Sequence, residues 1–150
     1  MKVTIQKLST QQASEPESAL LKIKEMNDRI RRAIELLEAS GAPNEILVQL
    51  DDQNLKVLVS DIFYVESVDF KTFIYTESTI YQSKLRLYEV EDLLKESDFL
   101  RVNRQIILNV NKIYSVSSAG GGRIEAILDN GEKVIVSRQY APLLKVRFGL

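Results

Sequence analysis

The chain has 150 residues and a formal net charge of −1, and it contains no histidine, cysteine or tryptophan. These absences exclude a Ser-His-Asp triad, thiol nucleophiles, thiolate metal sites and disulfides, and they leave only carboxylate, Lys or Tyr catalysis and a carboxylate-bound hard cation. No apolar run is long enough to span a bilayer or to form a signal peptide. We therefore expect a cytoplasmic protein with one ordinary domain, at most a short extension, and no metal or cofactor.

Charge is distributed unevenly along the chain. Residues 1–40 carry 7 Lys/Arg and 6 Asp/Glu, residues 41–100 carry 5 and 12, and residues 101–150 carry 8 and 3. The last third therefore has a net charge of +5 although the whole chain is nearly neutral. A basic segment is typical of proteins that bind a polyanion, although random scatter of charge explains it equally well.

The first 43 residues predict an N-terminal strand followed by a long amphipathic helix. Residues 3–8 alternate apolar and polar side chains, residues 14–17 (Ser-Glu-Pro-Glu) are typical of a helix start, and Gly41 is typical of a helix end. Apolar residues recur between these signals at spacings of three and four: Ile23, Met26, Ile30, Ala33, Ile34 and Leu37. We expect this face to pair with a second copy or another protein, and the alternative is that it packs on the remainder of the chain.

After Pro43 the pattern changes to short strands, which predicts a boundary between an extension (residues 1–43) and a main domain (residues 44–150). Ten strands are expected, at residues 46–48, 55–59, 62–66, 72–76, 80–82, 99–102, 106–108, 113–116, 124–128 and 134–136. Helical spacing predicts two short helices, at residues 85–94 and at residues 137–144 with Ser137 as the cap. Asn130 and Gly131 predict a type I′ hairpin turn. The predicted fold class is mainly β (α+β).

Four segments of the main domain carry distinctive motifs. Residues 61–67 read D-I-F-Y-V-E-S, residues 99–109 read F-L-R-V-N-R-Q-I-I-L-N, and residues 131–140 read G-E-K-V-I-V-S-R-Q-Y, while residues 85–89 begin a short helix. In order and spacing they resemble the LytTR-type DNA-binding domain of bacterial transcription regulators. The matching family patterns are the strand I-x-Y-I-E-A/S, the signature F-x-R-V-H-R-S-x-I-V-N, the final motif G-x-x-x-P-V-S-R-x-Y and the helix L-x-x-L-E. The resemblance covers residues 44–148.

The resemblance implies an elongated, mostly β fold that inserts loops, not a recognition helix, into successive major grooves, often at direct repeats. It implies the stand-alone form, since the first 40 residues leave no room for a receiver domain. Stand-alone members of the family are often paired with a small inhibitory membrane protein.

The resemblance also implies DNA contacts for particular residues. Lys71 lies where some members have a base-contacting His, Asn103 and Arg104 lie where the family commonly has His-Arg, and Arg138 matches the family's Arg. The two replaced histidines imply that a different base sequence is read.

The residue chemistry supports the same segments. Arg104 and Gln105 interrupt an apolar run, and pointing outward costs less free energy than burial. Arg138 would follow a helix cap, and an arginine can donate two parallel hydrogen bonds to guanine or to a phosphate. Asn109 flanks a turn from which its amide could donate to a phosphate. Each side chain taken alone is better explained as a solvated surface group. The resemblance reverses that preference for Arg104 and Arg138 and leaves the two interpretations of Lys71 equal.

The sequence thus predicts a sequence-specific, double-stranded DNA-binding transcription regulator, a dimer on DNA and not an enzyme, with no small-molecule substrate. The predicted DNA-binding residues are Lys71, Asn103, Arg104, Gln105, Asn109 and Arg138. The alternative is a protein-interaction module of the same fold that does not bind DNA, which the −7 charge of residues 41–100 favours because acidic groups repel phosphates. A carboxylate-dependent enzyme is a weaker alternative, since no spaced acid pair lies in an apolar context.

Overall fold

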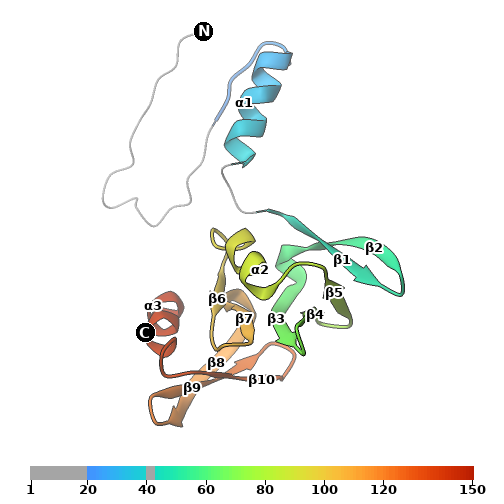
Figure 1. The fold of residues 1–150 in the computed structure, drawn as a ribbon. Coiled ribbons are helices and arrows are strands. Elements are labelled where there is room, and N and C mark those ends of the chain that lie inside the picture. The colour runs from blue at the N-terminus through green and yellow to red at the C-terminus, as the bar shows by residue number, and fades with distance from the viewer. Residues whose placement is uncertain (1–19, 40–42) are drawn as a thin grey trace. The chain divides into compact units, whose positions relative to one another are not determined.

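The computed structural model describes residues 20–39 and 43–150 (Figure 1). The chain divides into two compact units between Glu35 and Leu36. The predicted N-terminal strand and the predicted helix start at residues 14–17 lie outside the described residues. No helix among the described residues is long and apolar enough to cross a membrane.

The first helix, α1 (Asp28–Ala39), is shorter than the sequence predicts. Residues 20–27 are not helical, so the expectation of one continuous helix is wrong for this stretch. The reason is a local cap: the Asn27 Oδ1 accepts a hydrogen bond from the backbone N–H of Ile30 at 3.1 Å, which satisfies one of the unpaired donors of a first helical turn. Ile23 and Met26, expected on the apolar face of the helix, are exposed ahead of it.

Residues 43–150 form two antiparallel sheets, and all ten predicted strands are confirmed. The larger sheet has the order β2-β1-β5-β4-β3-β7-β6, and the smaller has the order β10-β9-β8. The strands of the larger sheet are β1 (Glu45–Leu50), β2 (Gln53–Leu58), β3 (Ile62–Val68), β4 (Lys71–Thr76), β5 (Ile80–Ser83), β6 (Phe99–Arg101) and β7 (Ile106–Asn109). Those of the smaller sheet are β8 (Ile113–Gly120), β9 (Arg123–Leu128) and β10 (Lys133–Val136), and the helices are α2 (Leu87–Leu93), α3 (Ala141–Phe148) and the 3-10 turns η2 (Val59–Asp61) and η3 (Val110–Lys112).

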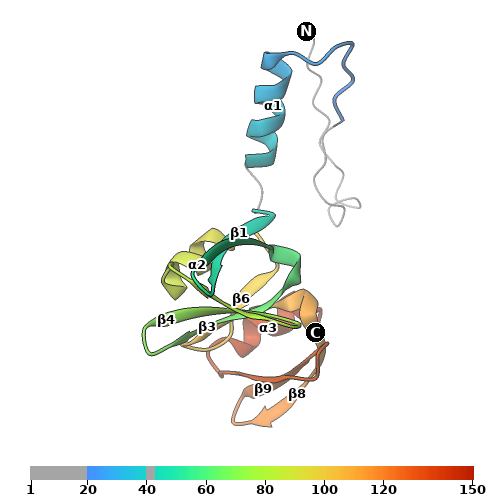
Figure 2. The ribbon, with the colours of Figure 1, turned by 90° about the vertical axis from the view of Figure 1, so that its right-hand side faces the viewer.

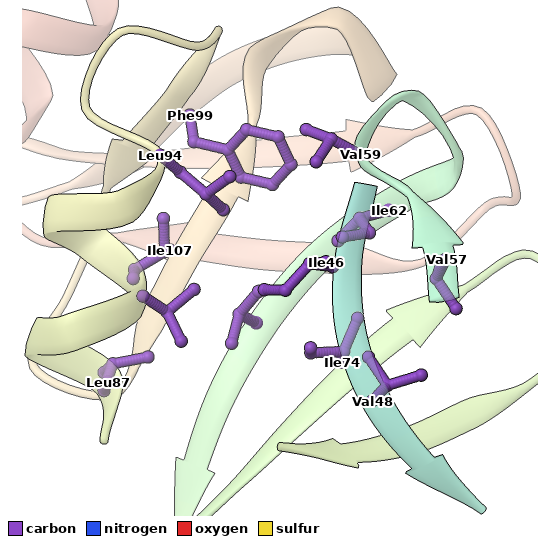
Figure 3. Close-up of a cluster of buried hydrophobic side chains, with 12 residues drawn as sticks. Ile46, Val48, Val57, Val59, Ile62, Ile74, Leu87, Leu94, Phe99 and Ile107 are labelled. Atoms are coloured by element: carbon purple, nitrogen blue, oxygen red, sulfur yellow. The ribbon is translucent and has the colours of Figure 1, made fainter. Parts of the chain in front are cut away.

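The larger sheet has a hydrophobic cluster on each face, because consecutive side chains of a strand point to opposite sides. Ile107 and Leu108 of β7 are both buried and belong to different clusters, and Phe99 and Leu100 of β6 divide in the same way. The cluster between this sheet and α2 is shown in Figure 3 and contains Ile46, Val48, Val57, Val59, Ile62, Val65, Ile74, Leu87, Val90, Leu94, Phe99 and Ile107.

The second cluster joins the larger sheet to the smaller sheet and α3, on the side away from α2 (Figure 2). Its buried members are Phe63, Leu100, Val102, Leu108, Ile113, Ile124, Ala126, Leu128, Val134, Val136, Ala141 and Leu144. Because each cluster buries twelve side chains from several elements, the loops at the strand ends stand on a fixed scaffold.

Two local predictions are wrong. The last helix begins at Ala141, not after Ser137, because the Ser137 carbonyl accepts hydrogen bonds from the backbone N–H groups of Tyr140 and Ala141, both at 3.0 Å, and so closes a turn instead. The β9–β10 turn is not type I′, since Gly131 (φ +85°) has a positive φ and Asn130 does not.

Two-residue turns with both central φ angles positive occur elsewhere. They lie at Asp51-Asp52, between β1 and β2, and at Asp69-Phe70, between β3 and β4. Positive φ angles at both central residues are the mark of the type I′ turn, so this turn type is used at two hairpins that lack glycine.

Candidate nucleic-acid interface

The tip of the β3–β4 hairpin is the first part of the candidate interface. Val68 and Lys71 face each other in the strand register, so only Asp69 (φ +49°) and Phe70 (φ +64°) form the turn. The Phe70 side chain is 88% exposed, and the Lys71 side chain is exposed beside it. Arg86, which precedes α2, stabilises the turn, because its Nη1 donates a hydrogen bond to the Phe70 carbonyl at 3.1 Å.

The loop between β6 and β7 is fixed by the Asn103 side chain. Its Oδ1 accepts hydrogen bonds from the backbone N–H groups of Gln105 (2.8 Å) and Ile106 (2.9 Å), and its Nδ2 donates to the Ile135 carbonyl (3.1 Å). The amide of Asn103 is thus used inside the protein. Asn103 therefore shapes the loop, and the next two residues, Arg104 and Gln105, expose their side chains to solvent.

Arg101 fixes the same loop from the other side. Its Nε donates to the Asn103 carbonyl at 2.8 Å, its Nη2 donates to the Arg104 carbonyl, and its Nη1 forms an ion pair with Glu91 Oε2 at 3.3 Å. The loop backbone therefore has hydrogen bonds on both sides, while the Arg104 side chain remains in solvent.

The turn after β10 carries the third exposed group, Arg138. The turn is joined to the β6–β7 loop, since the Ser137 N–H donates to the Val102 carbonyl at 2.8 Å. The aliphatic stem of Arg138 lies against Gly122, where an added Cβ would be 2.7 Å from the Arg138 Cγ. The expectation that Arg138 sits at a helix N-terminus is wrong because α3 begins three residues later, and the side chain is positioned by the glycine instead.

Arg104 and Gln105 line two neighbouring hollows of the surface. The first, of about 470 Å³, also has Phe70 and Arg86 in its wall, and the second, of about 760 Å³, has Arg138. The structure thus brings Asn103, Arg104, Gln105 and Arg138 together around one hollow, whereas Lys71 is exposed next to the hairpin tip and lines neither.

Asn109 does not join this surface. Its side chain is 3% exposed, its Nδ2 donates to the Ile62 carbonyl at 2.8 Å, and its Oδ1 accepts from the Asn111 N–H at 3.0 Å. The expectation that its amide donates to a phosphate is therefore wrong, because the amide is buried between β3 and β7 and satisfies backbone groups there.

The electrostatics of the surface favour an anion. Within residues 20–39 and 43–150, neither Arg104 nor Arg138 forms an ion pair. Glu91 is paired with Arg101, and Asp98 lies 3.9 Å from Arg147. Asp69 is the acidic residue in the wall of the first hollow. No group of three or more acidic side chains that could hold a metal ion occurs in the same described ranges.

Comparison with known proteins decides the family of this fold. The model of the LytTr DNA-binding domain matches residues 52–149. The chain belongs to the LytTr DNA-binding domain family. A solved LytTr DNA-binding domain from Bacillus cereus superimposes with a TM-score of 0.67 at 30% identity, over 73% of this chain and 100% of that chain.

Two further relatives of the LytTr domain differ in how much of their length is matched. The sensory transduction protein LytT of Bacillus anthracis is 28% identical over 124 residues, which are 83% of this chain and 50% of that protein. A Staphylococcus aureus protein described as an HTH-type transcriptional regulator is 24% identical over 139 residues, 92% of this chain and 94% of that protein. The chain spans about half the length of the LytT relatives it matches.

The LytTr surface also contains three residues that the sequence prediction did not include, namely Phe70, Arg86 and Gly122. The pattern V-D-F-K between two strand-like runs could have indicated Phe70, since a two-residue link places its middle residues at a hairpin tip. No sequence signal indicates that Arg86 bonds to the Phe70 carbonyl or that Gly122 lies under Arg138, because both contacts join segments far apart in the chain.

Proposed function

We propose that this protein is a cytoplasmic, sequence-specific transcription regulator that binds double-stranded DNA. The observation that carries the proposal is the arrangement of Arg104 and Arg138. Both guanidinium groups are exposed and without an ion pair in the described structure, they share one hollow, and the backbones that carry them are joined by the Ser137–Val102 hydrogen bond. Family membership agrees with this use of the surface.

The chemistry of each side chain sets its role. Arg104 and Arg138 are proposed to contact guanine edges or phosphates, because a guanidinium can donate two parallel hydrogen bonds to either. Gln105 is proposed to donate to a base or a phosphate, and Lys71 to neutralise a phosphate beside the hairpin tip. Asn103 is proposed to act on DNA only through the loop, since its amide is already bonded to the protein.

The proposed binding mode places the β3–β4 tip in one major groove and the turn that carries Arg138 in the next, with Arg104 between them, because Arg104 lines a hollow with each. A dimer on direct repeats would double the contacts to phosphate and base edges and so raise the affinity. For residues 1–43 we propose a contact with a second copy or with an inhibitory membrane protein. Ile30, Ala33 and Ile34 of α1 lie on one side of that helix at the spacing such a contact uses.

The experiment is a selection from random-sequence duplex DNA followed by equilibrium binding over a range of salt concentrations. The proposal expects enrichment of a defined sequence and a linear fall of log affinity with log salt as counterions are released. If no duplex is enriched or bound at about 50 mM salt, the protein-interaction module that does not bind DNA replaces this proposal.

A further inference from the structure

Phe70 occupies a position that a large side chain rarely takes. Its φ of +64° lies in the left-handed region, and it is the second central residue of a type I′ turn, where glycine or asparagine is the usual choice. The equivalent turn between β1 and β2 has Asp52 there, a residue that tolerates this conformation better. An aromatic side chain at this position disfavours the turn, so its presence calls for a compensating interaction.

The hydrophobic core supplies no compensating contact for the Phe70 ring. At 88%, Phe70 is the most exposed large apolar side chain in the described part of the chain. The phenyl ring thus gains almost nothing from the hydrophobic core. A partner that covers the ring would supply the apolar contact that the core does not.

The turn nevertheless holds the backbone of Phe70 in a defined place. The Arg86 Nη1 donates to the Phe70 carbonyl at 3.1 Å, and on both sides of the tip the strands are in register, with Val68 opposite Lys71 and Ser67 opposite Thr72. Thr72 is buried, which fixes the start of β4. A turn held this way loses little backbone freedom when its tip binds, which favours affinity and specificity.

The neighbours of the ring indicate the class of partner. Phe70 lines the same hollow as Arg86, Arg104 and Gln105, groups that donate hydrogen bonds to phosphates and base edges. A protein partner's apolar pocket would have to desolvate these cations without pairing them. A DNA duplex offers phosphates to the cations and one apolar group to the ring, the 5-methyl group of thymine.

We propose that Phe70 is a specificity-determining residue that contacts the 5-methyl group of a thymine in the major groove. The major groove is about 12 Å wide, and the tip of the β3–β4 hairpin, residues 68–71, extends past its pairing with β5 and β7 and carries an apolar side chain. This inference rests on the proposed function, because it assigns one base contact within the proposed interface.

The test uses the duplex that the wild-type protein selects, with each thymine replaced in turn by deoxyuracil, which lacks only the methyl group. Wild-type protein is expected to lose about fivefold in affinity at one thymine or at the corresponding thymine of each repeat, the effect of exposing roughly one buried methyl group.

Phe70→Asn keeps a residue suited to the turn but removes the ring. It is expected to bind the unmodified duplex about fivefold more weakly and to show no further loss at that thymine. Tyr114→Asn, which removes an exposed aromatic side chain from β8, is the matched control and is expected to behave as wild type.

The outcomes separate the two proposals. A wild-type protein that enriches no duplex contradicts both the DNA-binding function and the role of Phe70. A wild-type protein that binds its duplex but shows no loss with any deoxyuracil contradicts the role of Phe70 alone. The same holds if Phe70→Asn weakens binding equally on the thymine and deoxyuracil duplexes, because the variant then keeps the wild-type sensitivity and the lost contact is with something other than the methyl group.

Discussion

The ring of Tyr64 on β3 stacks on the ring of Tyr75 on β4, with centroids 4.2 Å apart and an angle of 14° between the ring planes. The two residues are partners in the strand register. The Tyr75 hydroxyl donates to Glu66 Oε1 at 3.2 Å, and Glu132 at the β9–β10 turn lies close enough to Tyr64 to raise its pKa. The stack lies within the hairpin that carries Phe70, and Glu132 belongs to the hairpin that leads to Arg138.

The Tyr64–Glu132 contact should stabilise the domain in a pH-dependent way. Burial first, and then the nearby carboxylate of Glu132, raise the pKa of Tyr64 above its ordinary value of 10.0. Because the folded-state pKa is above the unfolded-state value, the contribution is fully present below about pH 10 and is lost as pH rises through the folded-state pKa. Tyr64→Phe should lower the free energy of unfolding by about 1 kcal/mol at pH 8.

Urea unfolding of the wild type and of Tyr64→Phe, from pH 8 to pH 11, measures this effect. The difference between the two proteins isolates Tyr64 from the lysines that also titrate in this range. The difference should shrink above pH 10, and a difference that stays constant to pH 11 would show that Tyr64 does not titrate as its surroundings require.

Gly122 should be needed for the placement of Arg138. An alanine Cβ there would lie 2.7 Å from the Arg138 Cγ and 2.9 Å from its Cδ, so the arginine side chain must move. Gly122→Ala should weaken binding to the selected duplex by about as much as losing one arginine contact, on the order of 1 kcal/mol or more.

Gly121→Ala is the matched control for this prediction. Gly121 has a similar left-handed φ of +64°, so the backbone cost is comparable, but nothing lies within 4 Å of an added Cβ. Thermal unfolding should show similar losses of stability for both variants. Equal losses of DNA affinity for both would mean that the glycine loop, and not the Arg138 stem, determines the effect.

Asn109 should be important for stability and unimportant for DNA contact. Asn109→Ala leaves the buried Ile62 carbonyl and the Asn111 N–H without their side-chain partner, which should cost about 1–3 kcal/mol of unfolding free energy. The folded fraction should bind the selected duplex with unchanged affinity. Denaturant unfolding and binding of the same preparation measure both quantities, and a loss of affinity without a loss of stability would restore Asn109 to the interface.

The strands could be predicted because their signals are local. Ile46 and Val48 alternate with exposed residues in β1, and that period of two is visible in the sequence. The start of α1 could not be located in the same way, because the apolar spacing from Ile23 to Leu37 continues without a break across Asn27. The structure uses Asn27.

The candidate site was predictable only in part. Arg104 could be found because a polar group that interrupts an apolar run faces solvent at lower cost than burial, and Arg138 because it matches the family's Arg. The sequence pattern does not show whether an asparagine amide bonds to DNA or to the protein itself. Asn103 and Asn109 look alike in the sequence, and both are bonded internally to segments more than 30 residues away, to Ile135 and Ile62.

Arg104 and Arg138 are proposed to bind DNA together. The most direct measurement is equilibrium binding of the wild type, Arg104→Gln, Arg138→Gln and Arg147→Gln to the selected duplex over a salt series. Arg147 is the matched control because it is also exposed, but its Nη2 lies 3.9 Å from Asp98 Oδ1 and its side chain lines neither hollow.

We expect Arg104→Gln and Arg138→Gln each to lose about 1–3 kcal/mol of binding free energy, and Arg147→Gln to lose much less. Loss of a phosphate contact would also reduce the slope of log affinity against log salt by about 1. Binding by Arg104→Gln and Arg138→Gln that equals wild type at every salt concentration would contradict the account.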